Sequence, residues 1–174
     1  MEKRDLYDKD RRLTGKTIFK DDPVPKGMYI NVVLVFIQNT EGKFLIQKRS
    51  KRKNGLFATT GGHAKSGETP VQAIISEVEE EIGLHLKETD LIHYFGGRSD
   101  EEQVFWDDFY IKMDIDDIES LKIEEKEVDS LHWFSIDEIE MLYNEEKFFK
   151  NHYEEFEILL YWLEKNNKDS KKKE

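Results

Sequence analysis

Apolar and polar positions along the chain predict a sheet interrupted by an amphipathic helix and followed by further helices. Residues 28–38, MYINVVLVFIQ, form a nearly continuous apolar run, which is typical of a central strand buried on both faces. Further strands are predicted at residues 43–48, 91–96, 104–115 and 131–134. These elements favour an α+β fold in which helices cover both faces of a mixed sheet.

The interrupting helix has clear signals at both ends. Thr69 is suited to the N-cap, Pro70 to the first helical position, and Gln72 completes a capping box. Gly83 can adopt the left-handed conformation that ends a helix. The residues between them place an apolar stripe on one helix face, made of Val71, Ile74, Ile75, Val78 and Ile82.

The two ends of the chain differ from the segment between them. Residues 1–27 are predicted to form an N-terminal appendage, a hairpin around a turn at residues 8–12. Residues 28–164 form the expected domain, which ends in two helices. The last helix carries an aromatic and aliphatic stripe that suits either core packing or a homodimer contact. Residues 165–174, KNNKDSKKKE, are predicted to be a disordered basic tail.

Composition narrows the class of protein. A chain of 174 residues suits one domain with a core, and the absence of cysteine excludes disulfides and thiolate chemistry. The sequence contains no apolar run of membrane-spanning length, and its first residues lack the apolar core of a signal peptide. A net charge of -11 argues against a general nucleic-acid surface. We therefore expect a cytoplasmic protein that acts on small molecules.

Three glutamates share the polar side of the predicted helix. Glu77, Glu80 and Glu81 fall within an arc of roughly 100° opposite the apolar stripe. Carboxylate oxygens are the ligands that Mg²⁺ or Mn²⁺ prefers, and such an ion polarises phosphoryl groups. The alternative is a glutamate-rich exposed face, which is common in acidic proteins. The glycine-rich segment before the helix and the two caps favour the metal site.

This segment resembles the signature of the Nudix hydrolases, Gly-x5-Glu-x7-Arg-Glu-apolar-x-Glu-Glu-x-Gly-apolar. The chain matches that signature at Gly62, Glu68, Glu77, Val78, Glu80, Glu81, Gly83 and Leu84. The resemblance implies an α/β/α sandwich and metal-dependent cleavage of a diphosphate bond. It also implies that Glu77, Glu80 and Glu81 serve as metal ligands and catalytic groups, with Glu68 supporting the same metal network.

One position departs from the signature. Ser76 stands where the family has an arginine that pairs with the motif glutamates. A serine hydroxyl cannot form a bidentate pair with a carboxylate or offset its charge. Either another cation, such as Lys51, Lys53 or Arg98, takes over this role, or metal binding is weakened.

Several residues outside the signature are candidates for the site. Arg49 and Lys53 lie in a cationic run that suits diphosphate binding, although such runs are also found in solvated loops. The resemblance points to Glu127 as a fourth ligand or as the general base, with Glu124, Glu125, Glu101 and Glu102 as rivals. Trp106 suits either stacking on a base or core packing.

Within the family, the chain is similar to type I isopentenyl-diphosphate isomerases. The similarity lies in YDKDRRLTGKT, LIQKRSKRK and the Gly-Gly-His sequence that ends at His63. Those isomerases require a cysteine at the position of Gly61, and this chain contains none. The comparison therefore implies a hydrolase on an isomerase-like branch. His63 suits a metal or phosphate contact, or a hydrogen bond within the loop.

The leading hypothesis is a divalent-metal-dependent hydrolase of a nucleoside diphosphate linked to another group. The alternative is a catalytically silent Nudix-fold module that binds a nucleotide or an isoprenoid diphosphate, motivated by Ser76. A third possibility, a structural interaction protein, is motivated by the aromatic stripe of the last helix. Sequence leaves open the particular diphosphate and the oligomeric state.

Overall fold

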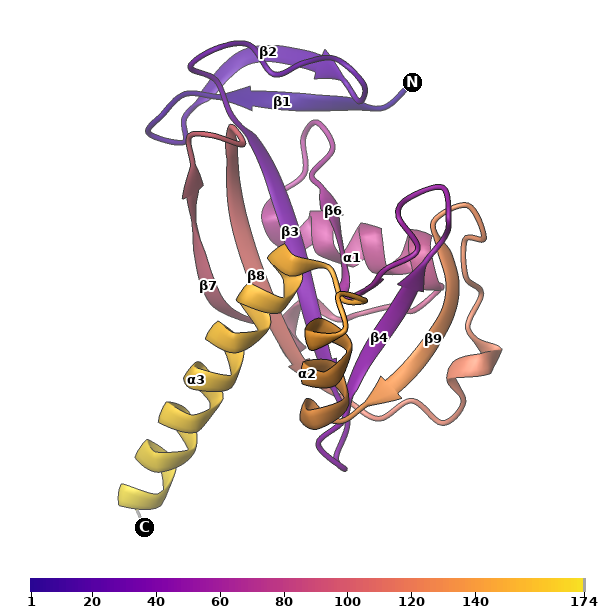
Figure 1. Cartoon of the computed structure of the whole chain (residues 1–174). Helices are drawn as coiled ribbons and strands as arrows, with labels where there is room; N and C mark the ends of the chain where they lie inside the picture. Colours follow the sequence, from indigo (N-terminus) through magenta and orange to yellow (C-terminus); the bar gives the residue numbers. More distant parts are fainter. Residues whose placement is uncertain (174) are drawn as a thin grey trace.

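A mixed sheet forms the centre of the computed structural model, which describes residues 1–173 (Figure 1). Its central strand is β3 (Ile30–Gln38), in which all but two residues are buried. β3 pairs in parallel with β8 (Val104–Lys112) and antiparallel with β6 (Thr60–His63). The continuous apolar run predicted this burial, because a strand covered on both faces has no polar side.

The remaining strands extend the sheet on both sides of β3. β7 (Ile92–Ser99) pairs with β8, while β4 (Phe44–Arg49) pairs with β5 (Phe57–Ala58) and β9 (Val128–Phe134). β3 and β4 are matched only at Gln38 and Phe44, next to the turn that joins them. Beyond this point β6, and not β4, pairs with β3. The sheet therefore diverges between β3 and β4.

Helices cover the two faces of this sheet. Val33, Val35 and Ile37 of β3 pack with α1 (Pro70–Ile82). Leu34 and Phe36 pack instead with α2 (Ile136–Asn144) and α3 (Lys150–Lys172). The division follows from the two-residue repeat of a strand, which sends successive side chains to opposite faces. The predicted α+β sandwich is confirmed.

The N-terminal residues form a separate two-stranded sheet across one end of the central sheet (Figure 1). β1 (Lys3–Tyr7) and β2 (Leu13–Phe19) are antiparallel. The turn between them docks on the domain through an ion pair between Arg11 and the buried Asp107. Tyr7 also exchanges backbone hydrogen bonds with Tyr29. This hairpin therefore lies against the domain.

The structure differs from the sequence expectations at several boundaries. β8 ends at Lys112, β7 continues to Ser99, and β9 begins at Val128. Gly61 and Gly62 were expected in a loop but lie on β6, because tertiary pairing with β3 overrides their weak strand propensity. Two short 3₁₀ turns, η1 (Glu88–Asp90) and η2 (Ile118–Ser120), were not predicted.

The expected disordered tail also differs. α3 continues to Lys172, and Glu174 lies outside the described residues. Lys168 pairs with Glu164 one turn away, and Lys171 and Lys172 lie in the last turn, where cations interact favourably with the helix dipole. Within residues 1–173, no helix combines the length and apolar character needed to cross a membrane.

Candidate functional site

A cavity of about 1190 Å³ lies where the hairpin, the sheet and the start of α3 meet. Residues of β3, β4, β6, β8, α1 and α3 line it, together with Arg4 and Lys20 from the N-terminal segment. It brings together most residues that were predicted for the site, namely Glu77, Glu80, Glu81, Glu127, Arg49, Lys53, His63 and Trp106. Glu68 is not among the lining residues.

Glu77 enters the cavity from α1 across the surface of Gly62. A Cβ atom at Gly62 would lie 2.3 Å from the Oε2 atom of Glu77, so a larger residue at position 62 would displace the Glu77 carboxylate. Burial, together with the negative charges of Glu81 and Glu80, raises the pKa of Glu77 to about 7. The spacing of glycine and glutamate in the sequence therefore reflects a direct packing contact.

Glu81 lies one helical turn beyond Glu77. A relay of two hydrogen bonds, made by Gln47 and Thr60 of the sheet, holds its carboxylate. The Nε2 atom of Gln47 donates to the Oε2 atom of Glu81 at 3.1 Å, and the hydroxyl of Thr60 donates to the Oε1 atom of Gln47 at 3.1 Å. Burial raises the pKa of Glu81 to about 7, while the hydrogen bond from Gln47 opposes this shift. Gln47 is only 4% exposed, and its role was not predicted from sequence.

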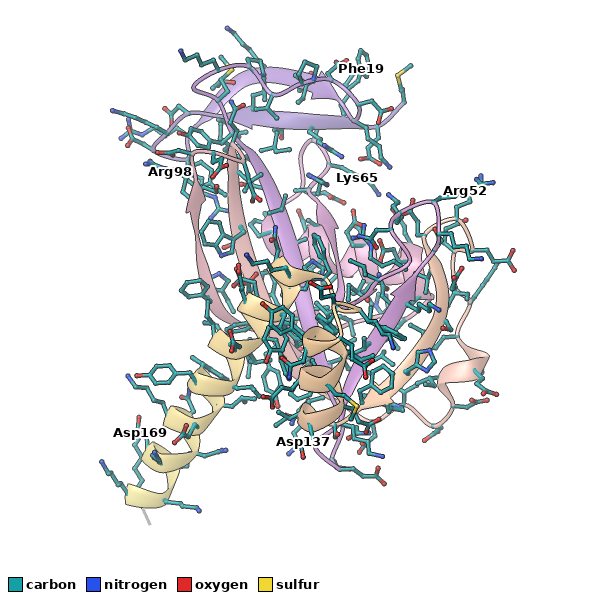
Figure 2. All side chains as sticks on the ribbon, in the orientation of Figure 1. Phe19, Arg52, Lys65, Arg98, Asp137 and Asp169 are labelled. Atoms are coloured by element: carbon teal, nitrogen blue, oxygen red, sulfur yellow. The ribbon has the colours of Figure 1, made fainter. Side chains whose placement is uncertain are left out.

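Glu80 differs from its two neighbours because it is ion-paired. Lys65 lies on the segment between β6 and α1 (Figure 2). Its ammonium group pairs with the Glu80 carboxylate. Lysine next to the signature's glycine segment thus supplies a cation to the helix. Of the cations considered from sequence, Lys53 pairs with Glu127 and Arg98 pairs with Asp100.

Ser76 and Glu68 are joined directly. The Ser76 hydroxyl donates to Oε1 of Glu68 at 2.8 Å, and the backbone N–H of Lys65 donates to its Oε2 at 2.8 Å. Both carboxylate oxygens of Glu68 are therefore engaged, one by α1 and the other by the segment that precedes it. In this arrangement Glu68 orients the segment, and the serine at the departing position anchors it.

The buried carboxylates suit a divalent ion. Within residues 1–173, no three acidic or histidine side chains already converge on a single point that would hold a metal. Mg²⁺ is commonly bound by one or two carboxylates and completed by waters and substrate phosphate oxygens. Glu77 and Glu81, whose raised pKa values show that their negative charges are poorly compensated, fit that requirement.

Cations gather in the same cavity. Arg49 lies with its guanidinium 5.3 Å from the ring centre of Phe149, and Nζ of Lys53 lies 2.8 Å from Oε2 of Glu127. Arg4 of β1 is 9% exposed, and its Nε has no hydrogen-bond partner among the described residues. Arg52, by contrast, is exposed (Figure 2). Arg4 was missed from sequence because only the docked hairpin brings it to the site.

Candidate general bases also line the cavity. Glu127 is next to Lys53, and its negative charge contributes to the raised pKa of Glu81. Glu124, Glu101 and Glu102 line the cavity as well, whereas Glu125 does not. Of these residues, Glu127 is the one that lies next to Glu81 as well as to a lysine.

His63 and Trp106 occupy opposite sides of β3. Burial, together with the nearby positive charges of Arg4, Lys20 and Lys53, lowers the pKa of His63 to about 4. His63 is therefore neutral at physiological pH. Trp106 lies against Gly97, where a Cβ atom would be 2.6 Å from the indole ring.

Comparisons with known proteins agree with this geometry. A family description of the NUDIX domain matches residues 28–156. An uncharacterised Nudix hydrolase of Listeria monocytogenes is 33% identical over 146 residues, which span 82% of this chain and 85% of that protein.

Solved structures share the fold. The crystal structure of DR0079 from Deinococcus radiodurans has a TM-score of 0.67 at 19% identity, covering 84% of this chain and 91% of that one. A bifunctional NMN adenylyltransferase/ADP ribose pyrophosphatase of Francisella tularensis, complexed with AMP and a manganese ion, has a TM-score of 0.57 at 20% identity. That match covers 76% of this chain and 41% of the Francisella chain. With its signature helix, its sheet and its curated relatives in agreement, the chain belongs to the Nudix hydrolase family.

Proposed function

We propose that the protein is a Mg²⁺- or Mn²⁺-dependent pyrophosphohydrolase that cleaves the diphosphate of a nucleoside diphosphate linked to another group. The observation that carries this proposal is the meeting of two kinds of charge in one cavity. Glu77 and Glu81 supply buried carboxylates, while Arg4, Arg49 and Lys53 supply cations at the same end. A diphosphate bridged to a metal ion is complementary to both sets.

Each group of residues has a separate role in the proposed reaction. Glu77 and Glu81 would hold the metal ion, which when bound neutralises phosphate charge and lowers the pKa of bound water. Arg49, Lys53 and Arg4 bind the phosphate oxygens. Glu127 accepts the proton of the attacking water, whose oxygen forms a new bond to phosphorus as the bond to the bridging oxygen breaks. Glu68 and Ser76 orient the segment before the helix.

The backbone around Gly61 favours hydrolysis over the isomerase reaction. A Cβ atom at Gly61 would lie 2.5 Å from the carbonyl oxygen of Val33 and 2.9 Å from Cβ of Leu34. The backbone at position 61 thus leaves no space for the cysteine that the isomerase reaction requires. The chain also has no cysteine elsewhere.

The first experiment measures, by chromatography of the products, hydrolysis with Mg²⁺ of a panel of nucleotide sugars, dinucleotides, oxidised nucleotides and isoprenoid diphosphates. Glu81→Gln should lower kcat on a responsive substrate on the order of 100-fold, or about 2.7 kcal/mol. Glu79→Gln is the matched control, because Glu79 is an exposed glutamate on the same helix. Unchanged activity in Glu81→Gln would remove that residue from the mechanism.

The second candidate function is a silent binding module. It is favoured by one observation, that Glu68 and Glu80 are both engaged with partners other than a metal. Ser76→Arg discriminates between the two functions. If the pairs made by Ser76 and Lys65 compensate for the missing arginine, turnover should change less than about threefold. A large gain in turnover would instead identify a site disabled at position 76.

A further inference from the structure

The end of the cavity formed by β8 and α3 contains buried polar atoms that the proposed phosphate chemistry does not use. Within the described chain, four of them have no hydrogen-bond partner: Nε1 of Trp106, Oδ2 of Asp108, Nδ1 of His152 and Oε2 of Glu155. All four side chains line the cavity, and Asp108 is only 1% exposed. A buried polar atom that is left unpaired destabilises the folded state. Trp106 and Asp108 lie two residues apart on β8 and so on the same face of the sheet, and Glu155 is a neighbour of Asp108. Their unpaired atoms indicate a ligand that supplies the missing partners.

The strand register gives the distance between this cluster and the phosphate end, which is the part of the cavity lined by Arg4, Arg49 and Lys53. His63 of β6 and Trp106 of β8 are both matched with Val32 of β3. Gly61 and Asp108 are both matched with Leu34, in the next row on the same face. Neighbouring strands lie about 4.8 Å apart, so the two ends of the cavity are separated by roughly 10 Å across β3.

The indole of Trp106 has a fixed position in this end. The indole occupies the space that a side chain at position 97 would fill, because residue 97 is glycine. Its ring centre is 6.2 Å from that of Phe95. Two aromatic rings and the aliphatic chain of Ile158 therefore line the same part of the cavity. Such walls suit a flat, apolar ring system that carries polar atoms on its edge.

The two carboxyl groups of the cluster act together. Burial raises the pKa of Asp108 well above its usual range, and the neighbouring carboxyl groups of Glu155 and Asp107 raise it further. The two neighbouring carboxyl groups therefore offer several acceptor oxygens to a ligand. The cations Arg4, Arg49 and Lys53 lie elsewhere in the cavity, where they can bind a diphosphate.

We propose that Trp106, Asp108 and Glu155 form a subsite for the heteroaromatic base of the ligand, and that this subsite selects bases with an exocyclic amino group. The amino group donates to the carboxyl oxygens, and an acceptor on the base receives the indole N–H. An alkylammonium group would satisfy the carboxyl groups but would leave the indole N–H unpaired. This proposal rests on the proposed function for the position of the diphosphate.

Binding of non-hydrolysable nucleotides tests the subsite apart from catalysis. The probes are α,β-methylene analogues of nucleoside diphosphates in matched pairs, adenosine against inosine and cytidine against uridine, titrated calorimetrically with Mg²⁺. In at least one pair, the amino-bearing member should bind on the order of tenfold more tightly than its oxo partner. Asp108→Asn and Glu155→Gln should each bring that ratio to within about threefold of one.

Two controls keep the result interpretable. Glu157→Gln changes an exposed glutamate on the same helix and should preserve the ratio. Methylenediphosphonate, which has no base, should bind wild type and Asp108→Asn equally. Trp106→Phe retains the aromatic wall without the N–H and provides a second variant should Asp108→Asn fail to fold. Equal affinity within both pairs in the wild type would overturn the proposal, as would a ratio unchanged in all three variants.

The outcome separates this subsite from the proposed function. A wild type that discriminates between bases but hydrolyses no substrate would retain the subsite and reject the hydrolase. Hydrolysis without discrimination between bases would retain the hydrolase and reject the subsite. Tight binding of choline or ethanolamine phosphate in place of the nucleotides would also overturn the assignment of a base.

Discussion

Gln47 illustrates how a single buried side chain can determine the position of a metal-binding carboxylate. Its amide donates to Glu81 and accepts from Thr60, so the orientation of the amide is fixed from both sides. Groups that hold a ligand in place are often as important for metal affinity as the ligand itself. The signature identifies Glu81 but carries no information about Gln47, which lies on a different strand.

Replacement of this amide should weaken metal binding without removing a ligand. Gln47→Leu leaves Glu81 without its donor, which raises the pKa of Glu81 further and allows the carboxylate to move. We expect Mg²⁺ affinity to fall about 10-fold or more in a calorimetric titration. Gln38→Leu serves as the control, because Gln38 lies at the other end of β3, beside Gly42 and Tyr110. Equal affinity in wild type and Gln47→Leu would show that the relay has no effect on the metal.

At the scale of elements, the N-terminal hairpin contributes to the site although it lies outside the signature. The Arg11–Asp107 ion pair anchors the turn of this hairpin, and β1 then carries Arg4 to the cavity. Arg4 is nearly buried, and its Nε atom lies 4.0 Å from Oε1 of Glu2. A buried guanidinium in a cavity with a free donor is suited to phosphate.

Loss of Arg4 should therefore affect substrate binding more than turnover. Arg4→Met preserves much of the packing volume while it removes the charge, and we expect KM for a diphosphate substrate to rise about tenfold with kcat changed less. Lys16→Met is the control, since it removes an exposed charge from the same hairpin. Steady-state kinetics with a substrate from the panel measure both values. A fall in kcat at constant KM would contradict a role in binding.

At the scale of the whole molecule, the site carries an electrostatic cost that a bound ion would relieve. Glu77 and Glu81 both have a pKa of about 7, above their ordinary value of 4.5. Because the folded state holds these protons more tightly, the associated stability is fully present below pH 4.5 and is lost as pH rises through about 7. Metal-free protein is therefore destabilised at these positions in its ionised form.

Thermal unfolding in EDTA can isolate this contribution. Glu77→Gln imitates the protonated carboxyl, so it should match wild type near pH 4.5 and have a higher Tm at pH 8, by about 2–4 °C for each kcal/mol. Saturating Mg²⁺ at pH 8 should raise the Tm of wild type more than that of the variant. If the difference in Tm between the two proteins is the same at both pH values, Glu77 is not buried in an uncompensated state.

The sequence by itself determined the local structure and the kind of chemistry. The caps at Thr69 and Gly83 and the apolar stripe between them are local features, so α1 was predicted with its bounds. The same spacing placed Glu77, Glu80 and Glu81 on one helix face. The central strand followed equally from its continuous apolar run, since burial on both faces requires no partner to be identified.

Only the tertiary structure decided which distant residues complete the site. Glu77 faces the cavity because Gly62 on β6 leaves space for it, and Glu81 is held by Gln47 from β4. Arg4 of β1, Asp108 of β8 and Glu155 of α3 reach the same cavity from three distant parts of the chain. These contacts depend on strand pairing and helix docking between segments far apart in sequence, which no local pattern of residues encodes.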